Sequence, residues 1–173
     1  ILQSLTAIIS SYIEDDALPF ALANKQYRLA VMTCRMKHLM ASDRPLAQKA
    51  GFILSFLANA LHPSLNYRFA ERVVFFYGSK PPDFCLRKEF RGRFIPLSEI
   101  NFKSAVIASG AIPIAVAGVK DIFGAPDGVY RDGGFLDYHI NQDYTTRSDE
   151  RTLFFHHQER IIPGWMDKRL KGR

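Results

Sequence analysis

The first sixteen residues place apolar side chains three or four positions apart, which is the spacing of one helix face. The positions that share this spacing are Leu2, Leu5, Ile9, Tyr12 and Ile13. Asp15, Asp16 and Pro19 then break the pattern. The sequence therefore predicts an amphipathic helix over residues 1–16, whose apolar face needs a sheet or a partner to cover it.

Two short apolar runs, at residues 27–36 and 72–77, have the length of buried strands. Continuous apolar runs of this kind are typical of strands covered on both faces, as in parallel sheets. The glycine and prolines of residues 78–82 turn the chain away from the second run. Residues 129–131 and 151–156 are further strand-like segments.

Residues 46–61 are long enough for a helix and are apolar around almost the whole circumference. Only Gln48, Ser55 and Asn59 form a narrow polar stripe, and Pro63 follows the helix end. Such a helix is either buried in a core or lies against lipid. We favour burial, and contact with lipid remains the alternative.

Residues 98–109 form a second predicted helix, with Ser98 as its N-cap and Glu99 in its first turn. Gly110 and Pro113 end it. Strands and helices therefore alternate along the chain, with no internal repeat. This order predicts one α/β domain in which helices flank a mostly parallel, layered sheet.

Composition agrees with one core of ordinary domain size, because 47% of the 173 residues are hydrophobic. The formal charge of +6 is concentrated in two basic groups. The first group is Arg87, Lys88, Arg91 and Arg93, and the second is Lys168, Arg169, Lys171 and Arg173. Such groups attract anionic lipid head groups or phosphate backbones, although charge runs more often only keep a surface hydrated.

Cys34 and Cys85 lack metal-ligand spacing, and we expect two buried free thiols in a reducing compartment. The apolar stretch at residues 104–119 is too short to cross a bilayer. The five histidines form no metal-binding pattern. We therefore expect no metal, no cofactor and no membrane-spanning segment, and we favour a cytoplasmic or peripheral membrane location.

The most informative segment is Asp132 followed by Gly133 and Gly134, directly after the strand-like residues 129–131. Glycine allows backbone conformations and close approaches that other residues do not, so a carboxylate can be presented at a strand end. Taken alone, Asp-Gly-Gly is more often a simple turn. Its interpretation depends on the segments around it.

Three segments together resemble the C-terminal half of the patatin-like phospholipases. They are the helix end Ala108-Ser109-Gly110-Ala111-Ile112-Pro113, the run Tyr130-Arg131-Asp132-Gly133-Gly134, and the tail Pro163-Gly164-Trp165-Met166-Asp167-Lys168. The resemblance spans most of residues 1–173 and is strongest from about residue 72 onward. It implies the C-terminal part of a single hydrolase domain, incomplete at its N-terminal side.

By this resemblance, Asp132 matches the aspartate of a serine-aspartate dyad, with Gly133 and Gly134 completing its motif. Patatin-like enzymes hydrolyse lipid acyl esters with a serine in a Gly-x-Ser-x-Gly elbow, preceded by a glycine-rich oxyanion loop. Neither segment occurs in this chain. Ser109 is a poor substitute, because Ile107 and Ala111 occupy the two positions where the elbow needs glycine. We therefore expect the nucleophile in a missing N-terminal segment and the chain alone to be inactive.

Two alternatives remain open. The chain is either part of a serine lipid hydrolase or a non-catalytic, lipid-binding or scaffolding relative of the same fold. The expected partners are a lipid or acyl-ester substrate, an anionic membrane surface, and the missing segment or a second subunit. Nucleic acid is not expected, since no stacking-aromatic motif accompanies the basic groups. Trp165 lies either at a lipid interface or packed on the domain.

Overall fold

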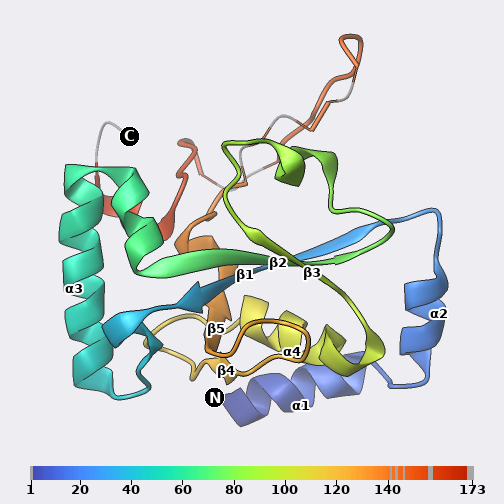
Figure 1. Ribbon diagram of the computed structural model, residues 1–173, viewed down its shortest axis with the longest axis horizontal. Coiled ribbons are helices and arrows are strands. Elements are labelled where there is room, and N and C mark those ends of the chain that lie inside the picture. Colours follow the sequence, from blue (N-terminus) through green and yellow to red (C-terminus); the bar gives the residue numbers. More distant parts are fainter. Residues whose placement is uncertain (1, 141, 143, 146, 156–157, 171–173) are drawn as a thin grey trace.

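The computed structural model describes residues 2–140, 142, 144–145, 147–155 and 158–170. At its centre is a mixed sheet with the strand order β3-β2-β1-β5-β4 (Figure 1). The strands are β1 (Leu29–Met36), β2 (Ala70–Tyr77), β3 (Arg93–Pro96), β4 (Val119–Lys120) and β5 (Val129–Asp132). The strands expected near residues 27–36, 72–77 and 129–131 are confirmed, and helices flank them as in other α/β domains.

The prediction of a mostly parallel sheet is wrong. In the described part of the chain only β2 and β3 pair in parallel, whereas β1 is antiparallel to both β2 and β5, and β4 to β5. Both central strands are largely buried on both faces, as expected. This pattern shows that each face of the sheet is covered, and it does not determine the strand direction.

The connection between β1 and β2 explains their antiparallel pairing. Met36 at the end of β1 pairs with Ala70 at the start of β2, so the chain leaves and re-enters the sheet at the same end. Helix α3 (Pro45–Leu61) lies within this connection and stands beside that end of the sheet (Figure 1). Because α3 does not cross a face of the sheet, the next strand runs in the opposite direction.

One face of the sheet packs against helix α4 (Glu99–Ser109). Val73 and Phe75 of β2 form a core there with Phe102 and Ala105 of α4. Ser98 caps α4 as predicted, because its hydroxyl accepts the Asn101 N–H while the Asn101 side chain accepts the Ser98 N–H. Two further helices, α1 (Leu2–Tyr12) and α2 (Ala17–Ala23), contact α4.

The opposite face is covered by the segment between β2 and β3 and by the C-terminal part of the chain. Val74 of β2 packs there with Cys85 and Phe90. Short 3-10 helices shape this layer and its surroundings, at His38–Ala41, Pro63–Arg68, Asp83–Leu86, Gly133–Phe135 and Trp165–Arg169. Cys34 and Cys85 are buried free thiols, as predicted.

Two further expectations are corrected. Residues 151–155 form no strand and are exposed, and His156 lies outside the described residues. Helix α3 is not buried as a whole: its polar stripe faces inward, and its leucines and Ile53 are exposed. The reason is that the stripe hydrogen-bonds to distant segments, which fix the rotation of the helix about its axis.

Candidate functional site

Asp132 is the last residue of β5, so its carboxylate is presented at a strand end, where the sequence places it. The backbone N–H of Asp132 donates to the carbonyl oxygen of Ala111, 3.2 Å away, in the loop after α4. The N–H of Gly134 donates to the Asp132 Oδ1 at 2.8 Å. The carboxylate is therefore held in one orientation by the turn that follows it.

Close contacts exclude a side chain at Gly133 and leave little room for one at Gly134. A Cβ on Gly133 would lie 2.6 Å from the Met32 carbonyl oxygen of β1, a distance at which atoms overlap. A Cβ on Gly134 would lie 3.2 Å from the Asp132 Oδ1. Asp-Gly-Gly at this position thus brings the turn directly onto β1 while leaving room for the carboxylate.

Burial raises the pKa of the Asp132 carboxyl above its ordinary range, and the hydrogen bond from Gly134 partly opposes this effect. Asp132 is partly exposed, so the carboxyl remains accessible. A carboxylate with a raised pKa is a better proton acceptor than a fully solvated one. The environment of Asp132 therefore suits a general base.

Arg131 and Asp43 position β5, and sequence analysis did not identify either. The Arg131 side chain is 1% exposed. Its Nη2 donates to the Asp43 Oδ1 at 2.8 Å, and its Nη1 donates to the Val116 carbonyl oxygen. The pair joins the residue before Asp132 to the segment that precedes α3. In the sequence, the feature that could have identified Arg131 is a charged side chain within a strand-like run, directly before Asp132.

The loop after α4 is also attached to α3. Ile114 has a positive φ of 69°, which is unusual for a β-branched residue. Its N–H donates to the Gln48 Oε1 at 2.8 Å, and this bond stabilises the turn. Because Asp132 is bonded to Ala111 of the same loop, Gln48 is coupled to the candidate site through that loop.

The structure brings no nucleophile to Asp132 within the described residues. Ser109, at the end of α4, has no hydrogen bond with the Asp132 carboxylate. Thr33 pairs with Asp132 in the sheet, but its buried hydroxyl donates to the Val73 carbonyl oxygen at 2.8 Å. Burial raises the pKa of the Cys34 thiol, which contacts the Gly133 carbonyl oxygen, so this cysteine stays protonated.

A cleft of about 730 Å³ lies beside the turn, but Asp132 does not line it. Asp137, five residues after Asp132, does line it and forms an ion pair with Arg72. The cleft walls also carry Lys88, Glu89 and Arg91. Basic and acidic side chains are mixed along these walls, so the cleft has no single charge preference and does not identify a ligand.

The tail of the resemblance packs onto the domain. Trp165 lies edge-on to Phe52 of α3, with ring centroids 5.5 Å apart. In the described residues, no group of three or more His, Cys, Asp or Glu side chains is placed to hold a metal ion. No helix in the same part of the chain is both long and apolar enough to span a membrane.

No protein-family model, curated protein or solved structure matches the chain. The resemblance to patatin-like phospholipases therefore stays a prediction from the sequence. Any inference about function therefore depends on the geometry of Asp132 and its two glycines.

Proposed function

We propose that the chain supplies the aspartate of a serine lipid acyl hydrolase of the patatin-like type. Asp132 is the base, and the serine belongs to sequence outside these 173 residues. The observation that carries the proposal is the Asp132 carboxyl itself, which is partly buried, has a raised pKa and is oriented by the Gly134 N–H.

The proposed chemistry is covalent. The Asp132 carboxylate accepts the serine proton as the hydroxyl oxygen attacks the ester carbonyl, and backbone N–H groups stabilise the negative charge on the carbonyl oxygen. The alcohol leaves with a proton from Asp132, and an acyl-serine remains. Asp132 then takes a proton from the water that attacks this ester, and it returns that proton to the serine oxygen as the acyl–serine bond breaks and the fatty acid is released.

The proposal is tested on the protein encoded by the whole gene, with a fluorophosphonate probe and an acyl ester substrate. We expect one serine upstream of the present chain to be labelled. Asp132→Asn should lower labelling and turnover at least about a hundredfold, as expected for loss of a general base. Asp127→Asn is the matched control, because this aspartate is exposed and lies in the turn between β4 and β5, five residues before Asp132.

A second candidate function is a non-catalytic, lipid-binding relative of the same fold. It is favoured by one observation: in the described part of the chain, the Asp132 carboxylate accepts a hydrogen bond from a backbone N–H and from no hydroxyl. Absence of fluorophosphonate labelling in the folded whole-gene protein would select this candidate. Normal turnover of Asp132→Asn would reject the role of Asp132 and leave lipid binding to be tested separately.

A further inference from the structure

Helix α3 presents an apolar face outward, which is the reverse of an ordinary surface helix. Its large outward residues are 49–83% exposed, and they are Leu46, Ile53, Leu54, Leu57 and Leu61. Ala50 and Ala60 are exposed on the same face. Lys49 is the one charged side chain among these exposed positions. We call this set of residues the outer face of α3.

The inward polar stripe prevents α3 from burying its outer face. The Ser55 hydroxyl donates to the Asn66 Oδ1 at 3.1 Å, and the Asn66 Nδ2 donates to the Asn59 Oδ1 at 2.8 Å. The Asn59 Nδ2 in turn donates to the Asp167 Oδ1 at 2.8 Å. Rotating the helix would break this buried network and leave its polar groups without partners, which is costly.

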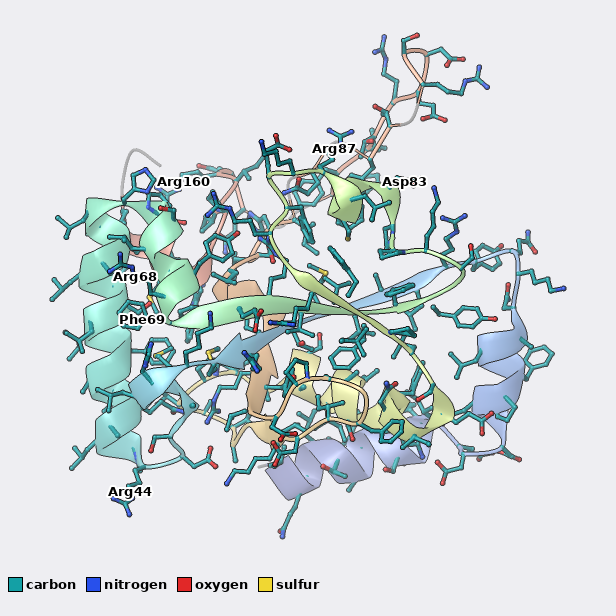
Figure 2. The ribbon with its side chains drawn as sticks, viewed as in Figure 1. Arg44, Arg68, Phe69, Asp83, Arg87 and Arg160 are labelled. Atoms are coloured by element: carbon teal, nitrogen blue, oxygen red, sulfur yellow. The ribbon has the colours of Figure 1, made fainter. Side chains whose placement is uncertain are left out.

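The unpaired charge along α3 and the segment that follows it is positive, whereas Asp43, just before α3, is paired with Arg131 and Lys120. Between Asp43 and Glu71 the chain contains no acidic residue. Arg44, Lys49 and Arg68 are exposed, and none of them forms an ion pair within the described residues. Figure 2 shows Arg44 at the end where α3 begins and Arg68 beside the helix. The apolar face is thus bordered by unpaired positive charge.

We propose that the outer face of α3 docks on an anionic lipid bilayer. A helix of 17 residues is about 26 Å long, and one with an apolar face and basic borders lies in the plane of the membrane interface. A symmetric dimer would bring the basic borders of two copies together without an acidic partner for either. Anionic lipid head groups instead attract them, so the charge complementarity selects the bilayer.

The helix that carries the outer face is connected to the candidate site through Gln48 on its inward side. Ile112 and Ile114 are 45% and 50% exposed in the loop that Gln48 of α3 holds and that bonds to Asp132. On the condition that the proposed function holds, docking brings the domain that carries Asp132 to the membrane that contains the substrate. Docking itself requires no nucleophile and is measured without turnover.

The test is sedimentation of the 173-residue chain with vesicles of phosphatidylcholine, with and without phosphatidylserine. We expect binding that depends on phosphatidylserine. Leu54→Gln/Leu57→Gln should weaken it at least about tenfold, because two large side chains no longer enter the interface. Ile100→Gln/Leu86→Gln is the matched control, since both residues are exposed elsewhere on the surface and should leave binding unchanged.

A charge variant completes the test. Arg44→Gln/Lys49→Gln/Arg68→Gln should remove the dependence on phosphatidylserine, with far-UV circular dichroism and a thermal melt showing that each variant is folded. Folded chain that does not sediment, or that binds equally in the leucine variant, overturns the proposal. A dimer in sedimentation equilibrium that the leucine variant abolishes assigns the face to a second copy and also overturns it. Vesicle binding by the 173-residue chain, together with no fluorophosphonate labelling of the whole-gene protein, rejects only the hydrolase.

Discussion

The guanidinium of Arg72 on β2 donates two hydrogen bonds of 2.6 Å to the carboxylate of Asp137. Both side chains are nearly buried, at 6% and 7% exposure, and the Arg72 guanidinium also lies over the Phe90 ring, 4.1 Å from its centroid. This ion pair fastens the segment after the Asp132 turn to the central sheet. The turn is thus held from both sides, by β1 beneath Gly133 and by Arg72 beyond it.

Removing the carboxylate charge of this pair should be strongly destabilising. Asp137→Asn leaves the Arg72 charge buried without its counter-charge, and loss of one partner of such a pair costs about 3–5 kcal/mol in the free energy of unfolding. Urea unfolding measures the change. Asp83→Asn is the control, because the Lys80–Asp83 pair is about half exposed and solvent screens it, so its loss should change stability far less. Equal effects would contradict the burial argument.

A methyl group at Gly133 should distort the turn that carries Asp132. The new Cβ meets the backbone of Met32, which has no flexible end to move, so we expect Gly133→Ala to cost about 1–3 kcal/mol of stability. Gly110→Ala provides the comparison, because its Cβ would lie 3.6 Å from a Leu5 side-chain atom, an ordinary contact. Thermal melts that rank Gly110→Ala as the worse variant would refute the close approach.

The stability of the chain should depend on pH through Asp132 in an unusual direction. A carboxyl whose pKa is raised on folding binds more protons in the native state, so its contribution to stability decreases as pH rises above the ordinary value of about 3.9. Asp132→Asn has no carboxyl to titrate at this position, so the variant does not lose this stability as pH rises. We expect the stability of the variant relative to wild type to improve between about pH 3 and pH 7, measured by denaturant unfolding at each pH. A relative stability that falls with pH would mean that the pKa is lowered.

The network under α3 should attach the C-terminal tail to the helix. Asn59→Leu removes its bonds to Asp167 and Asn66 and should cost about 1–3 kcal/mol, because buried polar atoms lose their partners. Trp165 is the single tryptophan and lies next to this network, so its fluorescence reports detachment of the tail. Gln3→Leu on exposed α1 is the control. An unchanged Trp165 spectrum in Asn59→Leu would show that the tail is held by other contacts.

Local signals predicted the two central strands and the helices α3 and α4, but not α2, β3 or β4. The capping residue Ser98 begins α4, and the apolar runs near residues 27–36 and 72–77 are the two central strands. Strand direction was not predicted, because covered faces produce the same sequence pattern in parallel and antiparallel strands. The direction follows instead from the path of the chain through α3, which begins and ends at one end of the sheet.

Long-range contacts account for what the sequence did not reveal. The orientation of α3 depends on Asp167, which lies 108 residues from Asn59. The support of β5 depends on Asp43, which lies 88 residues from Arg131. By contrast, the position of Asp132 at a strand end was predicted from the strand-like residues 129–131 and the two glycines that follow Asp132. The placement of Asp132 was therefore visible in the sequence, whereas the residues that support it were not.

Because Cys34 is buried beneath the Asp132 turn, the rate at which its thiol is alkylated can report how often that region opens. The thiol contacts the Gly133 carbonyl oxygen and packs in one core cluster with Phe135 and Met166, so a thiol reagent can reach Cys34 only when the turn or the C-terminal tail moves away. Cys85 lies under a different segment, and burial raises its pKa to about 11. The rates at which the two cysteines are alkylated thus count the openings of two separate regions, one of which carries Asp132.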